Sequence, residues 1–126
     1  MASNIAFLQN DAFDETGKLL VNSGGKPVFV VVKASWCGHC KTSSPEVQKF
    51  ADSSSDKVLV ACIREGDGQT PSEKTLMTRI KKIFPDFRGF PHFGLFLNGS
   101  RVDASPTART SDAFKSFTNQ HGKTNI

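Results

Sequence analysis

Short apolar runs alternate with polar segments along the chain, and their periodicities predict alternating strands and helices. Val28–Val32 is apolar at every position and mostly β-branched, which predicts a central strand buried on both faces. Lys57–Ile63 has the same character and predicts a second buried strand. We also expect an edge strand over Asn4–Gln9 and a short helix over Asp11–Leu20.

A helical spacing of apolar positions follows each buried strand. The first helix is expected to begin between Trp36 and Cys40 and to end near Ala51, with Pro45 kinking it. Its inward positions would be Cys40, Ser44, Val47, Phe50 and Ala51. The second begins at a capping box, Thr70-Pro71-Ser72-Glu73, and its apolar stripe contains Leu76, Met77, Ile80, Ile83 and Phe84.

The last third of the chain predicts a hairpin and a final helix. Phe93–Leu97 and Ser100–Ala104 would pair as antiparallel strands around the two-residue turn Asn98-Gly99. Ser111 would cap the last helix. The whole order predicts an α/β fold, with a central mixed sheet flanked by helices on both faces, in a single domain spanning residues 1–126.

Composition narrows the class of protein. The chain has 126 residues, 37% of them hydrophobic, with eleven Phe and no Tyr, so we expect a core built from phenylalanine. Its net charge of +4 is scattered, without a basic run interleaved with aromatics, so we expect no nucleic-acid binding. The apolar runs are too short to span a membrane, and we expect a monomer without a membrane segment.

Three cysteines leave one unpaired within the chain, which is unlike a disulfide-stapled scaffold. The first residues lack the basic and apolar regions of a signal peptide, and the last residues are not a retention signal for the endoplasmic reticulum. The cytoplasm is therefore the expected compartment. The lumen of the endoplasmic reticulum or secretion is the alternative if the sequence is a trimmed chain.

Cys37 and Cys40 form a C-x-x-C pair directly after a buried strand and at the start of a helix. A helix N-terminus carries unpaired N–H groups and a partial positive charge, which lower the pKa of a thiol placed there. Zinc would need four ligands, and Cys62 and His39 could join the pair only if the fold brought them together. A structural disulfide would close too short a loop to stabilise the fold much. A redox couple is the favoured interpretation, with no cofactor and no metal.

Four segments resemble one known family, in order along nearly the whole chain. They are WCGHCK (Trp36–Lys41) with Pro45 behind it, FRGFPHFGLFLNG (Phe87–Gly99), ARTSDAFKSFTN (Ala108–Asn119) and NDAFDE (Asn10–Glu15). The chain resembles the thioredoxin superfamily, and its Gly-His dipeptide is similar to that of protein disulfide isomerase domains, where most thioredoxins have Gly-Pro. The resemblance implies a thioredoxin fold and a thiol–disulfide oxidoreductase.

The resemblance also implies roles for individual residues. Cys37 would attack a substrate disulfide, and Cys40 would resolve the mixed disulfide that forms. Pro91 would be cis, with the backbone beside it pairing with an extended substrate and the ring keeping metal away from the dithiol. Phe90 would line the substrate groove, and Trp36 would pack beside the dithiol.

Three residues around the cysteines are candidates for tuning their redox potential. His39, next to Gly38, would be partly cationic at neutral pH, so it would favour the Cys37 thiolate and make the disulfide more oxidising. Lys33 stands where relatives usually have an aromatic residue. It is either a solvated side chain or a charge that lowers the pKa of Cys37.

The sequence departs from the family at a buried ion pair. The resemblance implies an acid at Val31, paired with a lysine at Cys62, and this acid is thought to carry the proton of the resolving thiol. Both partners are absent together, which leaves no stranded charge. We therefore expect slow resolution by Cys40, and we expect Cys62 to be a small buried hydrophobe. The loop over residues 64–70 is expected to be enlarged.

The expected substrates are protein disulfides and dithiols, with a reductase or glutathione as electron partner. Two alternatives stay open. One is a cytosolic thioredoxin-like reductase fed by a reductase partner, which the absent signal peptide favours. The other is a thioredoxin-fold binding or scaffold protein with weak catalysis, which the missing acid at Val31 favours.

Overall fold

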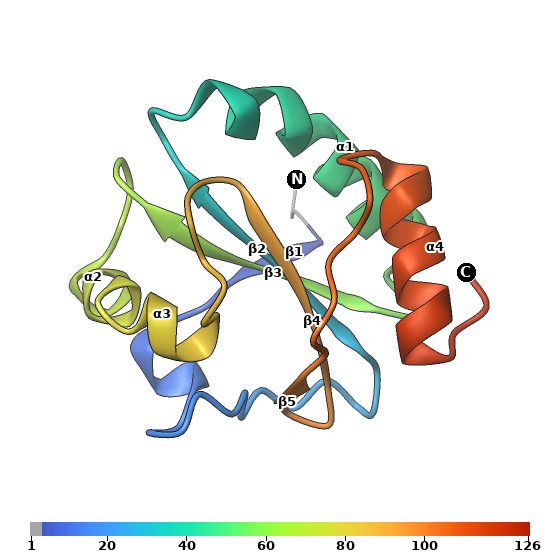
Figure 1. Ribbon diagram of the computed structural model, residues 1–126, viewed down its shortest axis with the longest axis horizontal. Coiled ribbons are helices and arrows are strands. Elements are labelled where there is room, and N and C mark those ends of the chain that lie inside the picture. Colours follow the sequence, from blue (N-terminus) through green and yellow to red (C-terminus); the bar gives the residue numbers. More distant parts are fainter. Residues whose placement is uncertain (1–3) are drawn as a thin grey trace.

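The computed structural model describes residues 4–126, which form one five-stranded sheet with helices on both faces (Figure 1). This arrangement confirms the predicted α/β class. The elements in chain order are β1 (Ile5–Phe7), the 3-10 helix η1 (Asn10–Ala12), β2 (Val28–Ala34), α1 (Gly38–Ser54), β3 (Leu59–Glu65), α2 (Pro71–Met77), α3 (Ile80–Ile83), β4 (His92–Leu97), β5 (Ser100–Arg101) and α4 (Ser111–Gly122).

The sheet is mixed, with the strand order β1-β3-β2-β4-β5. β3 is parallel to β1 and β2, whereas β4 is antiparallel to β2 and β5. β2 lies at the centre and is covered on both faces, which explains its continuous apolar sequence. In this register Val31 lies opposite Cys62 on one side and Phe93 on the other.

Two hydrophobic cores lie on opposite faces of the sheet, because successive side chains of a strand point to opposite sides. In Figure 1, α1 and α4 cover one face, and α2, α3 and η1 cover the other. In the first core, the ring of Phe29 lies 5.0–6.0 Å from those of Phe50, Phe93 and Phe114. The second core contains Phe13, Phe84 and Phe96. The prediction of a phenylalanine core is confirmed.

The helix predicted over Asp11–Leu20 is wrong. Only η1 forms there, and the chain then turns back so that Phe13 and Leu19 pair across an antiparallel bridge. The Asp14 carboxylate holds the turn, since it accepts two backbone N–H groups at 2.9 and 3.0 Å, and Gly17 adopts a φ of +89°. An aspartate side chain that accepts hydrogen bonds from nearby backbone N–H groups favours a turn over a helix, and this explains why no α-helix forms in this segment.

α1 begins where it was predicted to begin and runs past the expected end at Ala51 to Ser54. It continues through Pro45, which is exposed; the kink expected there stays a prediction. Ser43 is buried, whereas Ser44, predicted to face inward, is only half-buried. The inward face is therefore rotated slightly from the one that the sequence pattern indicated.

The predicted capping box is present at the start of α2. The Thr70 hydroxyl accepts the N–H of Glu73, and the Glu73 carboxylate accepts the N–H of Thr70. The apolar stripe does not form one helix, because the chain breaks at Arg79 between α2 and α3. The Arg79 guanidinium donates to the carbonyl oxygens of Asn10 and Phe13, which ties this break to η1.

Two details of the C-terminal third differ from the prediction. β5 ends at Arg101, so the returning strand is shorter than the expected Ser100–Ala104. Thr110, and not Ser111, caps α4 with its side chain. The N–H of Ser111 instead donates to the carboxylate of Glu46 at 2.9 Å, which joins α4 to α1.

Within residues 4–126, no helix combines the length and the apolar character needed to cross a membrane. The same residues hold no group of three or more His, Cys, Asp and Glu side chains arranged to bind a metal ion.

Candidate active site

Cys37 lies between the end of β2 and the first residue of α1, where it is the N-cap of the helix. Its sulfur accepts the backbone N–H of Cys40 at 3.3 Å. Its thiol donates to the carbonyl oxygen of Phe90 at 3.4 Å, across 53 residues of sequence. The strand and helix start therefore hold the half-buried Cys37 thiol against the loop before β4.

The two thiols have opposite electrostatic environments. The pKa of Cys37 is lowered chiefly by the hydrogen bond from the Cys40 side chain, with help from backbone N–H groups and from the charge of Arg109, against its own burial. Burial and the neighbouring Cys37 raise the pKa of Cys40 to about 11. Cys40 is only 3% exposed. This split suits an attacking thiol at the surface and a protected thiol behind it.

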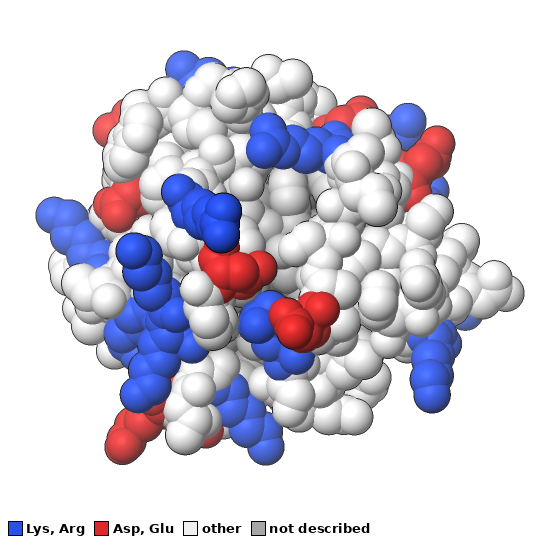
Figure 2. All heavy atoms as spheres, in the orientation of Figure 1, with Lys and Arg blue, Asp and Glu red and all other residues white. Residues whose placement is uncertain are grey.

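The loop before β4 provides an aromatic surface beside Cys37. The Phe90–Pro91 peptide bond is cis, as the resemblance implied. The exposed ring of Trp36 meets that of Phe90 edge to face at 6.0 Å, and Phe90 meets Phe87 at 5.3 Å. Figure 2 shows that Lys and Arg gather over α2 and α3, whereas the surface over the start of α1 is largely uncharged. The dithiol therefore lies beside a largely uncharged surface that includes the rings of Trp36 and Phe90.

The loop after β3 also borders this site, which sequence reasoning missed. The N–H of Asp67 donates to the hydroxyl of Ser35 at 3.0 Å. Gly66 has a φ of +98°, and a Cβ there would collide with Ser35 and with the ring of Trp36. No spacing rule links Gly66 to the cysteines, so only the folded chain reveals that this loop supports Trp36.

The family model that matches the chain is that of thioredoxin, over residues 4–120. The chain belongs to the thioredoxin family. Family membership and the placement of Cys37 and Cys40 support a thiol–disulfide oxidoreductase in general.

Several known proteins are similar to this thioredoxin-family chain. The thioredoxin-like protein 453L of Invertebrate iridescent virus 6 is 34% identical over 83% of this chain and 85% of its own length. Protein disulfide-isomerase 1 of Dictyostelium discoideum is 32% identical over 98% of this chain. The chain spans only 31% of that relative and 30% of the probable protein disulfide-isomerase A6 of Medicago sativa.

Solved structures support the fold. Thioredoxin f from spinach chloroplast matches with a TM-score of 0.64 and 22% identity, over 97% of this chain and 96% of its own. The Trx4 domain of ERdj5 matches with a TM-score of 0.66 and 18% identity, over 97% of this chain and 96% of its own. At these identities the matches show the fold alone.

The three residues predicted to tune the redox potential lie on two different elements of the site. Gly38 and His39 are exposed in the first turn of α1, beside Cys37. Lys33 is half-buried on β2, and it lines the cavities that also contain Cys40. The structure thus places Lys33 near the resolving thiol, whereas the sequence alone suggested an effect on Cys37.

Val31 and Cys62, the positions at which the resemblance implies an ion pair, lie opposite each other on neighbouring strands. Val31 and Cys62 face the same core, at 4% and 0% exposure. Burial raises the pKa of the Cys62 thiol to about 12, so this thiol stays protonated at neutral pH. Cys62 therefore behaves as the small buried hydrophobe that the sequence predicted.

Proposed function

We propose that this domain catalyses thiol–disulfide exchange on extended, cysteine-containing protein segments, with a redox potential closer to protein disulfide isomerase than to thioredoxin. The observation that carries the proposal is the position of the Cys37 sulfur. It is the N-cap of α1, accepts a backbone N–H, and lies 3.4 Å from the carbonyl oxygen of Phe90. An extended substrate laid along the Phe90–Pro91 backbone would bring its disulfide to this sulfur.

The reaction transfers two electrons from the dithiol to the substrate. The Cys37 thiolate attacks one sulfur of a substrate disulfide, a mixed disulfide forms, and the first substrate thiol leaves. The Cys40 thiolate then attacks the Cys37 sulfur, which releases the second substrate thiol and leaves a Cys37–Cys40 disulfide. The reverse sequence oxidises a substrate dithiol. Glutathione or a reductase would restore the starting state.

The isomerase-like potential rests on what surrounds Cys37. A thiolate held by N–H donors and nearby positive charge stabilises the reduced form, so the disulfide becomes a stronger oxidant. Arg109 supplies one such charge, and His39 lies in the adjacent turn of the helix. The similarity to protein disulfide isomerases over almost the whole chain favours the same choice.

A second candidate is a thioredoxin-fold binding protein with weak catalysis. One observation favours it: Val31 and Cys62 are both neutral and buried, where the family's acid and lysine are implied. Such a protein would still capture substrates at Cys37 but would release them slowly through Cys40.

Insulin reduction in the presence of dithiothreitol tests the proposal. We expect the wild-type protein to accelerate the precipitation of insulin chains. Cys37→Ser should abolish the acceleration, and Cys62→Ala should retain it, because Cys62 is fully buried and away from the substrate. A wild-type rate no higher than that of dithiothreitol alone would refute catalysis and favour the binding protein.

A further inference from the structure

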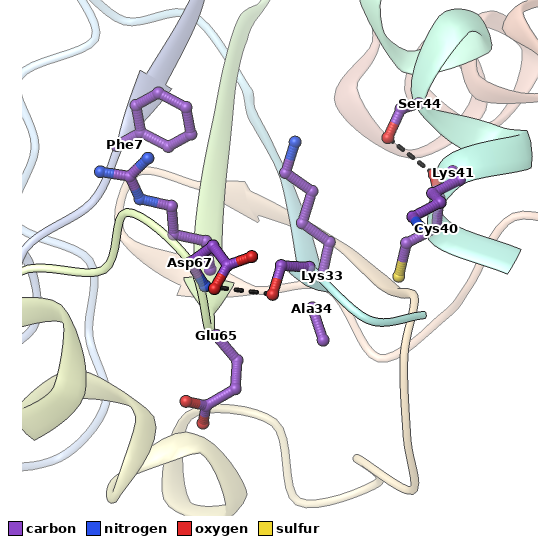
Figure 3. Close-up of a pocket in the computed structure, with 10 residues that line it drawn as sticks. Phe7, Lys33, Ala34, Cys40, Lys41, Ser44, Glu65 and Asp67 are labelled. Atoms are coloured by element: carbon purple, nitrogen blue, oxygen red, sulfur yellow. Dashed lines mark hydrogen bonds between the residues drawn. The ribbon is translucent and has the colours of Figure 1, made fainter. Parts of the chain in front are cut away.

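Two cavities meet at Cys40, and Lys33 lines both. The outer cavity, about 220 Å³, is also lined by Lys41, Arg64, Glu65 and Asp67. The inner cavity, about 70 Å³, is also lined by Val31, Ser44, Val47 and Cys62. Figure 3 shows the Lys33 side chain between Phe7 on one side and Cys40 and Ser44 on the other.

To resolve the mixed disulfide, the Cys40 thiol must first lose its proton. Only a thiolate attacks a disulfide, yet this thiol is 3% exposed, and burial disfavours its charged form. The inner cavity has Val31 where the family's acid is implied, and none of the described residues that line it carries a carboxylate to take the proton. Another charged group has to favour the thiolate for resolution to proceed.

Lys33 is the charged side chain that the two cavities share. Among the described residues that line the inner cavity, it alone carries a charge. In the outer cavity, Arg64 is engaged by the Glu73 carboxylate at 2.6 and 3.0 Å and lies over the Phe7 ring. Within residues 4–126, no carboxylate forms an ion pair with Lys33, so its charge is not neutralised by a direct partner.

We propose that Lys33 is a positioning residue for the resolving step, in place of the family's buried acid. Its ammonium group stabilises the Cys40 thiolate as it forms, and the cavities offer the proton a hydrated path to solvent. The inner cavity is large enough to hold water, and the Ser44 hydroxyl and the Cys40 and Cys62 thiols give such water polar partners. The inference rests on the proposed exchange function and deepens it.

The step balances without a further reactant. Cys40 loses its proton to water in the cavity, and its sulfur forms a bond with the Cys37 sulfur. The bond between Cys37 and the substrate sulfur breaks, and the departing substrate thiolate takes up a proton from solvent. Lys33 keeps its proton throughout and acts only by its charge. The charge of Lys33 lowers the pKa of Cys40, as this role requires, although burial and Cys37 raise that pKa by more.

Several other charged residues line the outer cavity together with Cys40 and bear on the test. Lys41 comes from the same helix, Arg64 and Glu65 come from β3, and Asp67 comes from the following loop. Lys33 differs from all of them because it alone also reaches the inner cavity behind the thiol. Replacing Lys33 should therefore have an effect that removing a distant cation does not reproduce.

The test follows the reduced protein after mixing with a limiting amount of 5,5′-dithiobis(2-nitrobenzoic acid). The first thionitrobenzoate released reports attack by Cys37, and the second reports resolution by Cys40. We expect Lys33→Met to slow the second release about tenfold, since one pKa unit changes the thiolate fraction about tenfold, and to move its pH midpoint upward. The first release should change less than about twofold, because Lys33 lines the cavities at Cys40 and is not among the groups that lower the pKa of Cys37.

Two further variants decide the interpretation. Lys33→Arg keeps the charge, so its second release should have the rate and the pH midpoint of the wild type. Lys49→Met removes the same charge from an exposed position of α1 that lines neither cavity, and should change neither release. An unchanged second release in Lys33→Met, or an equally slow one in Lys33→Arg, overturns the inference. A wild-type protein without a second release overturns the exchange function itself, which separates the two failures.

Discussion

Val31 and Cys62 are direct partners across the two central parallel strands, and both side chains are buried behind the resolving thiol. The resemblance to the thioredoxin family implies an acid at the first of these positions and a lysine at the second. Here both residues are neutral, so no buried charge is left unpaired in the core. Both side chains line the cavity behind Cys40, so we expect their neutrality to affect the chemistry of this thiol.

Restoring the acid should accelerate resolution. We expect Val31→Glu to raise the rate of the second thionitrobenzoate release, because a carboxylate behind Cys40 can accept its proton. The variant should also lose stability, by about 3 kcal/mol, since the new acid has no lysine partner at Cys62. Val31→Gln is the matched control, with the same shape and no acid. Equal second-release rates in the two variants would show that the missing acid does not limit resolution.

The reduction potential of the Cys37–Cys40 couple should lie nearer the ~−180 mV of protein disulfide isomerase than the ~−270 mV of thioredoxin. Equilibration with reduced and oxidised glutathione measures it. His39→Pro should shift the potential to a more negative value, because a polar, protonatable ring beside Cys37 is lost and the thiolate is less favoured. A wild-type potential at or below that of thioredoxin would contradict the isomerase-like assignment.

Trp36 should matter for protein substrates and not for stability. Its side chain is 64% exposed and meets the Phe90 ring edge to face, so it forms part of the surface beside Cys37. We expect Trp36→Ala to lower the insulin-reduction rate several-fold and to leave the first thionitrobenzoate release unchanged. The free energy of unfolding should change by less than about 0.5 kcal/mol. Leu20→Ala, at a second exposed apolar position, is the control and should leave insulin reduction as it is.

The Arg64–Glu73 ion pair should make stability depend on pH. Burial opposes ionisation of Glu73, but the bonds from Arg64 and Thr70 outweigh it and hold the pKa of this carboxyl below its usual value. The stabilisation is therefore complete above the ordinary glutamate pKa of ~4.3 and is lost as the pH falls through the lower folded value.

Urea unfolding, followed by circular dichroism at several pH values, measures this contribution. Glu73→Gln should be less stable than the wild type at pH 7, by about 2 kcal/mol, because the charged hydrogen bonds from the partly exposed Arg64 are lost. The difference between the two proteins should shrink as the solution is acidified. A difference that stays constant down to pH 3 would mean that Glu73 does not carry the stabilisation.

Local signals in the sequence account for much of the fold. The apolar run of β2, the capping box at Thr70 and the turn at Asn98-Gly99 each lie within a few residues, and all three formed as predicted. The prediction failed over Asp11–Leu20, where the Asp14 carboxylate competes with helical hydrogen bonds. The spacing of apolar residues could not predict this outcome. Whether the turn or the helix forms depends on how Phe13 and Leu19 pack against the sheet.

The sequence by itself determined that the chain carries a C-x-x-C pair after a buried strand, because strand periodicity and helix start are local properties. Only the tertiary structure decided which groups surround that pair. The Phe90 carbonyl reaches Cys37 from 53 residues away, and Gly66 comes up against Trp36 from the loop after β3. Lys33 likewise comes to line the cavities at Cys40, because the packing of α1 on the sheet, and not distance along the chain, sets these neighbours.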